Sequence, residues 1–326
     1  MSPAPAPTRV RAIAMLLLAN VFWGLSFPVI KVLVLLNAAL APGSGGTYAV
    51  AYAVAPRFVV SLLVLGLWQI FVRRSPLSAT DLKRGALIGL FGAAGMLLQN
   101  DGLRFTSAST SAYLTQLYAI LIPLWLAFRN RRNPGAVVWI SCALVLAGVA
   151  ILGRFDWRAL QFGRGEWETL LCSVFFMVQI LLLDDPRFAG DRPGRLLLVW
   201  VTVEAAVFGG LAAAGAPSAA ALVVPWVTPV WLTCTLLLAG FCTLGAFSIM
   251  IVWQSKITAT EAGLIYCTEP IFGSLFALVL PAVFSRWAGL AYANETATGS
   301  LLLGGALITG ANVLIQLKPP AGSAAS

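Results

Sequence analysis

Long apolar segments, separated by short polar stretches, recur along the whole chain. A helix that crosses a bilayer needs about 20 mostly apolar residues, because each residue advances it by about 1.5 Å. Ten segments of this kind are predicted, at about 12–36, 48–71, 85–103, 107–128, 134–152, 166–183, 195–214, 228–253, 258–284 and 297–317. The pattern therefore predicts an all-α integral membrane protein with ten transmembrane helices.

The composition supports this fold class. Apolar residues make up 60% of the 326 residues and charged residues 10%, whereas a soluble domain carries about 25% charged residues. The chain has no histidine, and its five cysteines lie inside predicted spans without zinc-type spacing. We therefore expect no metal and no other cofactor, and the carboxylates are the candidate groups for any proton coupling.

The charge distribution predicts an orientation. The net charge of +9 comes from basic residues in short loops, so it does not indicate a nucleic-acid partner. If the N-terminus is cytoplasmic, the inside segments carry about fourteen Lys and Arg residues and the outside loops about five. This positive-inside bias predicts a multi-pass protein of the cell inner membrane with both termini in the cytoplasm. The first apolar run exceeds the core of a signal peptide, so we interpret it as a retained span.

Two parts of the sequence repeat each other. Residues 105–128 match 256–279 at an offset of about 151 residues, and 19–23 resemble 172–176 at nearly the same offset. Two units of five spans have odd parity, so they sit in opposite orientations in the membrane and place a substrate site between them. We predict a disordered tail at 1–10, repeats at 11–153 and 165–317, and a C-terminal tail at 318–326.

The segment 258–284 carries Glu269 and Pro270 near its middle. A carboxylate at membrane depth is costly unless it faces protein or water. Proline has no N–H, so Pro270 frees the carbonyl of Tyr266, and lipid does not tolerate such loose backbone. This pattern predicts a broken helix that lines a solute pathway. The alternative is a structural kink with a hydrogen-bonded glutamate.

Several motifs resemble the EamA-type family of the drug/metabolite transporter superfamily. They are Phe22-Trp23-Gly24 with Lys31, Arg57-Phe58, the TSAST stretch at 106–110 and Glu269-Pro270. The resemblance covers about 11–317 and implies ten helices in two inverted five-helix repeats. It also implies transport of small metabolites, often the export of amino acids. The chain departs from the family in Pro56, in the long loop 285–296, and in lacking an acidic residue at 128–132.

One face of the first span could bind a small solute. Asn20, Trp23, Phe27 and Lys31 recur at steps of three or four residues, and Pro28 is expected to break the helix and free a carbonyl. An amide, two aromatic rings and a cation suit a solute that bears a carboxylate. The alternative is that the rings are ordinary packing and that Lys31 reaches the membrane interface.

Polar residues deep in other spans complete the candidate site. Arg57 lies too deep to reach the interface and needs an acid, carbonyls or an anionic solute. Glu204 lies at a comparable depth and is a second candidate for coupling beside Glu269. The predicted substrate-binding residues are Asn20, Trp23, Phe27, Arg57, Tyr113, Gln116, Gln179, Tyr266 and Glu269. Interhelical hydrogen bonding is the alternative for Tyr113 and Gln116 in the fourth span, and a structural ion pair is the alternative for Arg57.

The sequence favours a secondary-active or facilitative transporter over an enzyme. We expect it to move small metabolites, amino acids or related compounds first among them, by alternating access and in the direction of export. The bilayer, a small solute and a proton are the expected partners, and the chain is a monomer or a homodimer. No nucleotide-binding motif of the GxxxxGK[ST] type occurs. The alternatives are an intramembrane lipid-modifying enzyme, for which Asp184-Asp185 is the acid pair, and a membrane scaffold.

Overall fold

Helices make up the regular structure of this chain in the computed structural model, which describes residues 6–73, 76–102, 105–106, 111, 114–152, 163–185 and 193–317. No strand occurs in those ranges. The helices of the first half are α1 (Ala6–Leu40), α2 (Gly46–Trp68), α3 (Ala79–Gly102), α5 (Tyr118–Asn130) and α6 (Ala136–Leu152). Those of the second half are α7 (Arg164–Asp184), α8 (Pro193–Gly215), α9 (Ala219–Val223), α10 (Pro229–Leu237), α11 (Ala246–Trp253), α12 (Ala259–Tyr266), α13 (Glu269–Ala277), α14 (Leu280–Ala288) and α15 (Gly299–Leu317).

The apolar helices support a membrane protein, although the predicted count of ten spans is not reached. Each predicted span coincides at least in part with helix, but five helical stretches are long and apolar enough to cross a bilayer by themselves. A sixth is obtained if α12–α14 counts as one bent span. Two further apolar helices, Ala136–Ile151 and Leu302–Ile315, are shorter. These counts refer to the described residues.

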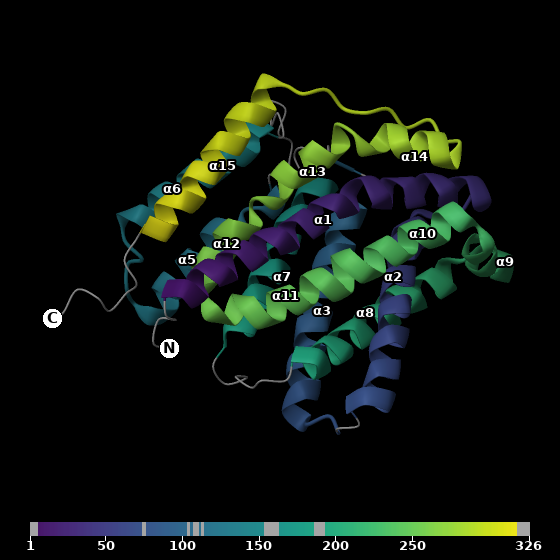
Figure 1. The fold of residues 1–326 in the computed structure, drawn as a ribbon, viewed down its shortest axis with the longest axis horizontal. Helices are drawn as coiled ribbons and strands as arrows, with labels where there is room; N and C mark the ends of the chain where they lie inside the picture. Colours follow the sequence, from purple (N-terminus) through teal and green to yellow (C-terminus); the bar gives the residue numbers. More distant parts are fainter. Residues whose placement is uncertain are drawn as a thin grey trace.

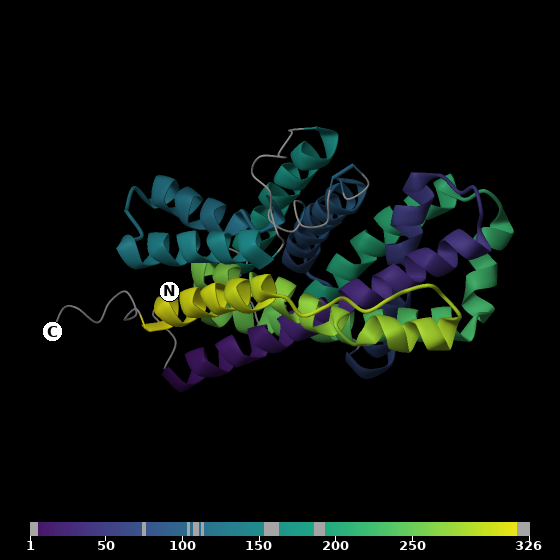
Figure 2. The same cartoon turned by 90° about the horizontal axis from the view of Figure 1, so that it is seen from above.

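Helices from the two halves pack against one another rather than forming separate bundles. α6 lies along α15 at one end of the molecule, and α2 lies along α8 (Figure 1). α3 packs between α7 and α8, and α1 crosses α13 and α11 (Figures 1 and 2). The two halves therefore share one interior, and residues far apart in sequence can meet in it.

The glycines of α3 let α8 approach closely. A Cβ at Gly85 would lie 2.6 Å from the Cβ of Val199, and one at Gly89 would lie 2.9 Å from the carbonyl oxygen of Trp200. Both distances are too short for real carbon atoms. The small-residue pattern of this helix is therefore a packing feature, as close helix contacts in membranes require.

The predicted break at Glu269-Pro270 is confirmed. α12 ends at Tyr266 and α13 begins at Glu269, with Cys267 and Thr268 in a turn between them. A second bend, of 54°, separates α13 from α14 and was not predicted. Pro281 explains it, because its missing N–H leaves the carbonyl of Ala277 without a helical partner.

The loop after α14 stabilises this second bend. The backbone N–H of Glu295 donates to the carbonyl of Ala277 at 2.9 Å, which replaces the bond that Pro281 cannot make. The side-chain oxygen of Asn294 accepts from the N–H of Ala282 at 2.7 Å, in the first turn of α14. The unusually long loop 285–296 noted in the sequence thus caps a short, bent helix.

Two expectations near the N-terminus were wrong. α1 runs unbroken from Ala6 to Leu40 with Pro28 inside it. One lost backbone hydrogen bond does not end a helix that its neighbours hold by packing. α1 also begins within the tail predicted at 1–10, since a proline such as Pro7 is tolerated in a first turn. Residues 1–5 and 318–326 lie outside the described part of the chain.

Candidate functional site

The break between α12 and α13 is held by Asn20 of α1. Its side chain is fully buried, and its Nδ2 donates to the carbonyl of Ile265 at 2.8 Å and to Oγ1 of Thr268 at 2.9 Å. Thr268 Oγ1 in turn donates to the same carbonyl at 2.8 Å. The backbone carbonyl of Ile265 at the end of α12 is therefore hydrogen-bonded by protein groups, as is required of backbone groups inside a membrane.

A second amide, from another helix, reaches the last turn of α12. Nδ2 of Asn312, on α15, donates to the carbonyl of Leu264 at 3.2 Å and to that of Ile308 at 2.9 Å. The side-chain amides therefore donate to the carbonyls of Leu264 and Ile265. The carbonyl of Tyr266, which the position of Pro270 predicted to be free, receives neither of these bonds. No local sequence pattern pointed to Asn312, because its partner Leu264 lies 48 residues away.

Aromatic rings line the interior beside this break. Trp23 lies edge-on to Tyr266 with ring centroids 5.4 Å apart, and 6.2 Å from the ring of Phe247. The hydroxyl of Tyr266 donates to Oε1 of Gln254 at 2.8 Å. Nε2 of Gln254 donates to the carbonyl of Ile180 at 2.8 Å. Gln254 is fully buried, and sequence reasoning missed its role in orienting Tyr266.

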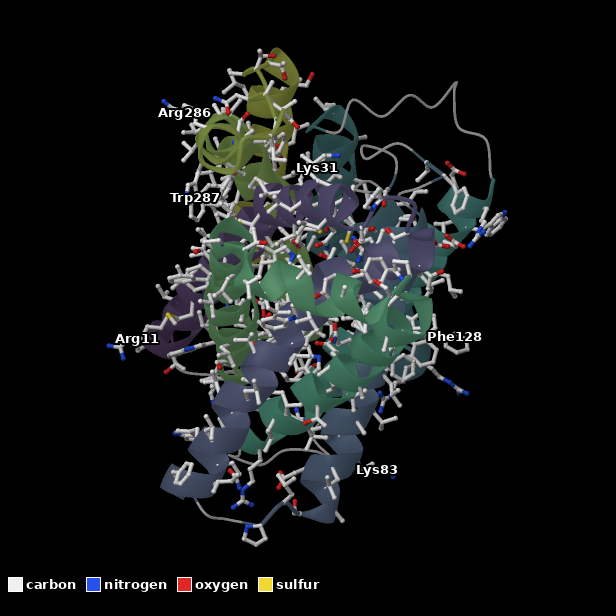
Figure 3. The ribbon with its side chains drawn as sticks, turned by 90° about the vertical axis from the view of Figure 1, so that its right-hand side faces the viewer. Arg11, Lys31, Lys83, Phe128, Arg286 and Trp287 are labelled. Atoms are coloured by element: carbon white, nitrogen blue, oxygen red, sulfur yellow. The ribbon has the colours of Figure 1, made fainter. Side chains whose placement is uncertain are left out.

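The predicted face of the first span divides into a buried and an exposed part. Asn20 and Trp23 point into the interior, whereas Phe27 is 49% exposed and lies over Gly273 of α13. Lys31 is exposed at the periphery, toward the same end of the molecule as Arg286 (Figure 3). The position of Lys31 agrees with the interfacial alternative rather than with a binding role.

Arg57, on α2, is a buried cation without a carboxylate in contact. It is 7% exposed, its Nη2 lies 3.1 Å from the sulfur of Met96, and its Nε has no hydrogen-bond partner. The charges of Glu204 and Glu269 act on it electrostatically. Among the described residues, neither acid forms an ion pair with it within 4.0 Å. The sequence placed Glu204 at a depth comparable to that of Arg57, and in the structure the two residues are close enough to interact electrostatically.

The two acids differ in their surroundings. Glu204 is fully buried on α8, and neither of its carboxylate oxygens has a hydrogen-bond partner. Glu269 is half-buried at the first position of α13 and forms no hydrogen bond within the described chain. Glu269 is therefore the acid that solvent or a solute can reach more directly.

Gln179, on α7, meets Glu204 against α3. Its Nε2 donates to the carbonyl of Ile88 at 3.2 Å. A Cβ at Gly92 would lie 2.3 Å from that nitrogen and 2.8 Å from Oε1 of Glu204. A glycine is therefore needed at this position, because any side chain would displace both polar groups.

Gln116 lies on the first-half counterpart of the broken helix. Gln116 is buried and its Oε1 has no partner, whereas Tyr113 lies outside the described residues. Gln116 and Leu117 form a turn directly before α5, and α5 begins at Tyr118, 151 residues before Glu269. Tyr118 and Glu269 interact electrostatically, so the two turns approach each other.

A π-helical segment lies beside this cluster. Residues Leu238–Gly245 join α10 to α11 with π-helical hydrogen bonding, which is frequent at functional sites. The Cys242 thiol donates to the carbonyl of Phe22 at 3.0 Å, and the Ser61 hydroxyl contacts the carbonyl of Ala239 at 3.4 Å. Neither the segment nor these contacts were expected from the sequence.

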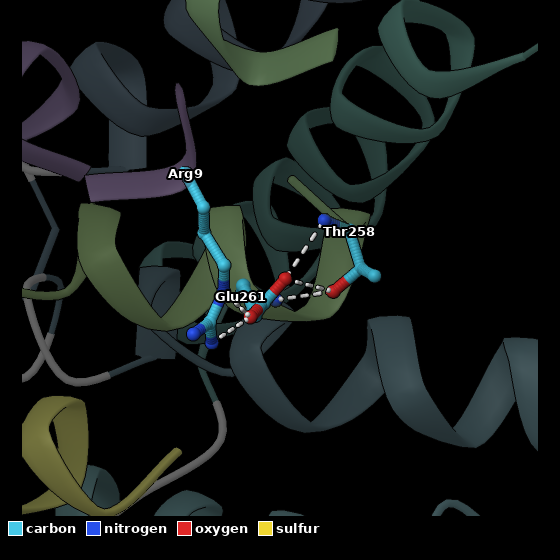
Figure 4. Close-up of polar contacts among 3 residues, drawn as sticks. All are labelled: Arg9, Thr258 and Glu261. Carbon is cyan, nitrogen blue, oxygen red and sulfur yellow. Dashed lines mark hydrogen bonds and ion pairs between the residues drawn. The ribbon is translucent and has the colours of Figure 1, made fainter. Parts of the chain in front are cut away.

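Glu261 caps α12, as its position after Thr258 indicates. Oε2 of Glu261 accepts from the N–H of Thr258 at 3.0 Å, and Oγ1 of Thr258 accepts from the N–H of Glu261 at 3.2 Å (Figure 4). Arg9 of α1 donates through Nη2 to Oε1 of Glu261 at 2.5 Å. This acid therefore joins α1 to α12 and takes no part in the central cluster.

Metal binding has no support in the described residues. They contain no group of three or more Cys, Asp or Glu side chains that could hold an ion. The five cysteines are buried and unpaired.

Comparisons with known proteins relate the chain to transporters. Residues 10–154 match the model of the EamA-like transporter family. A protein of Archaeoglobus fulgidus, named an uncharacterized transporter, is 24% identical over 270 residues, which are 82% of this chain and 77% of that protein. A solved crystal structure is similar with a TM-score of 0.69 and 18% identity, covering 94% of this chain and 97% of the other. At this identity the likeness shows the fold alone.

Proposed function

We propose that this chain, whose residues 10–154 belong to the EamA-like transporter family, carries small metabolites across the cell inner membrane by alternating access. Amino acids and related compounds are the proposed solutes, and export is the proposed direction. The solute would occupy the interior between the halves, beside the break in the α12–α13 helix. Both termini would lie in the cytoplasm.

The observation that carries this proposal is Glu269 itself. It lies where the helix is interrupted, half-buried and without a hydrogen bond among the described residues. A purely structural glutamate at membrane depth would be expected to have a protein partner. An acid without a hydrogen bond beside a broken helix is typical of a site where a substrate or an ion binds.

The inverted-repeat arrangement is also part of the proposal, and the backbone supports it. The N–H of Leu117 donates to Leu114 and that of Thr268 to Ile265, so the same turn recurs after 151 residues. The pairs α2 with α8 and α6 with α15 join corresponding spans of the two predicted repeats. Two such units that rock against each other would open the shared interior to either side.

We propose Glu269 and Glu204 as the coupling acids, with Trp23 and Tyr266 as the aromatic wall of the solute site. Burial disfavours an ionised carboxylate, so each acid can bind and release a proton as its surroundings change. Glu269 would exchange protons with solvent, because Glu204 is sealed in this conformation.

Counterflow by the purified protein tests the proposal. A thermal-shift screen against amino acids and small carboxylates identifies a stabilising solute. Proteoliposomes preloaded with that solute should then accumulate its labelled form. Glu269→Gln should abolish the response of flux to a pH gradient, whereas the exposed Glu295→Gln should leave it unchanged. Absence of counterflow for every stabilising solute would contradict transport, and unchanged gradient dependence in Glu269→Gln would remove this acid from coupling.

A further inference from the structure

The charges around Arg57 do not balance by direct contact. Arg57, Glu204 and Glu269 lie on three helices, α2, α8 and α13, and interact electrostatically. Among the described residues the guanidinium Nε nonetheless forms no hydrogen bond, and the Glu204 carboxylate, which has the Trp200 indole as a neighbour, forms none of ordinary geometry. Leaving a buried charge without a partner is costly. The Arg57 guanidinium can donate hydrogen bonds and the two carboxylates can accept them, but they do not bond to each other. A polar group of a ligand could therefore bind between them.

The number of charges limits which protonation states are favourable. With both acids ionised, the cluster carries one excess negative charge in a buried place. With one proton shared between the two acids, the three residues sum to zero. Glu204 is the acid that is fully sealed and unpartnered, so the neutral form is favoured there. In the ligand-free state, Arg57 is then balanced by Glu269.

We propose that Arg57 binds the carboxylate of the solute, and that this binding brings one proton onto the Glu269–Glu204 pair. This inference rests on the proposed transport function and specifies its substrate class and the sign of its coupling. The solute carboxylate replaces Glu269 as the counter-ion of the guanidinium. Glu269 then accepts a proton from solvent, so that Arg57, two neutral acids and one carboxylate again sum to zero.

The geometry favours an anionic group over a cationic one. A guanidinium presents a planar fork that matches a carboxylate in two hydrogen bonds. Among the described residues, Nε forms no hydrogen bond and Nη2 donates to the weak acceptor Met96, while the guanidinium carbon lies 4.7 Å from the centroid of the Phe58 ring. The rings of Trp23 and Tyr266 provide an apolar surface for the rest of the solute. A cation would instead have to enter beside Arg57.

Other titratable groups near the cluster do not alter this balance. Cys242 of the π-helical segment interacts with Arg57 and Glu269. Tyr118 of α5 and Cys267 of the turn interact with Glu269. Thiols and phenols ordinarily ionise above about pH 8, so these groups are neutral at physiological pH. The remaining protons of the cluster belong to the two acids.

Three probes with one skeleton test the proposal on the purified full chain in nanodiscs. 3-Phenylpropionate has a carboxylate only, phenylalanine has a carboxylate and an ammonium group, and phenethylamine has an ammonium group only. We expect the first two to bind and phenethylamine to bind at least tenfold more weakly. Because binding takes up one proton, the affinity for 3-phenylpropionate should fall by about tenfold for each unit that the pH rises, over the pH range in which that proton is taken up. A pH indicator in weak buffer should record about one proton taken up per 3-phenylpropionate bound, and less for phenylalanine, because its ammonium group can balance an ionised Glu269.

Variants separate recognition from structure. Arg57→Gln should lower the affinity for 3-phenylpropionate by about tenfold or more, because a charge-assisted hydrogen-bonded pair is lost. Arg57→Lys should restore part of that affinity. Arg84→Gln, which loses a bond to the carbonyl of Leu183 outside the central cluster, is the matched control and should bind normally. The double variant Glu204→Gln/Glu269→Gln should still bind 3-phenylpropionate, but without proton uptake and without pH dependence. This variant reports on the proposal even if Arg57→Gln fails to fold.

Equal binding of phenethylamine and 3-phenylpropionate would overturn the proposal, as would proton uptake that persists in the double variant. Counterflow distinguishes this failure from failure of transport. Flux of a solute without a carboxylate would contradict the inference and leave the transport function intact. Proton-linked carboxylate binding without any counterflow would support the inference and contradict transport.

Discussion

The contact between α1 and the broken helix makes a quantitative prediction for Gly24→Ala. A Cβ at Gly24 would lie 2.6 Å from the Cβ of Phe272 and 2.8 Å from the backbone nitrogen of Gly273. Favourable contacts between carbon atoms lie at about 3.5–4.0 Å, so the helices must separate by about 1 Å. Two of the three nearest atoms, the nitrogen of Gly273 and the carbonyl carbon of Phe272, are backbone, so rotation of a side chain cannot relieve the overlap.

The expected magnitude follows from two opposing effects. Overpacking of a close contact costs about 1–3 kcal/mol, and replacing a helical glycine by alanine contributes about 0.5–1 kcal/mol in return. The two ranges combine to a net loss of about 0–2.5 kcal/mol, and because the overlap includes backbone atoms we expect about 1–2 kcal/mol. Solute binding should also weaken, because the shift reaches the turn that carries Glu269. Gly210→Ala on α8 is the control, since no atom lies within 4 Å of its added Cβ.

Thermal unfolding in detergent, followed by fluorescence size-exclusion, measures both variants against the wild type. Gly24→Ala should unfold several degrees lower, and Gly210→Ala at the wild-type temperature or slightly higher. Equal unfolding temperatures for Gly24→Ala and Gly210→Ala would refute the close α1–α13 contact on which the geometry of the break depends.

Two further substitutions test individual hydrogen bonds. Asn20→Ala removes two buried bonds at the end of α12 and should cost about 1–3 kcal/mol, measured by thermal unfolding; a loss below about 0.5 kcal/mol would contradict its role as the clamp of the break. Glu261→Gln weakens an ion pair whose side chains are 21% and 16% exposed. It should cost less than about 1 kcal/mol and leave solute affinity unchanged, and a large loss of affinity in binding assays would connect it to the central site.

Local chemistry explains which parts of this fold the sequence could predict. The break at Glu269 was predictable because it follows from the missing N–H of Pro270, which can be read from that single residue without knowledge of its neighbours in space. The same reasoning applied to Pro281 would have found the bend before α14. It failed at Pro28, where packing of α1 against its neighbours outweighs one lost bond. The capping role of Glu261 was predictable because Thr258 lies three residues before it.

The central cluster depends on tertiary contacts that no local pattern encodes. Arg57 and Glu204 were each conspicuous as buried charges, yet their proximity follows from how α2 packs along α8. Gln254 orients Tyr266, and Asn312 reaches the turn of α12 from another helix. Such amides look the same in sequence whether they hold two helices together or face a cavity.

Access of water to position 269 from both sides of the membrane tests the central claim most directly. The five native cysteines are buried and can be replaced, which leaves Glu269→Cys as the single thiol. A membrane-impermeant methanethiosulfonate reagent should label it when applied to either side of proteoliposomes, and a bound solute should slow the reaction. A thiol that stays unlabelled from both sides, or that reacts from one side alone, would contradict alternating access around the broken helix.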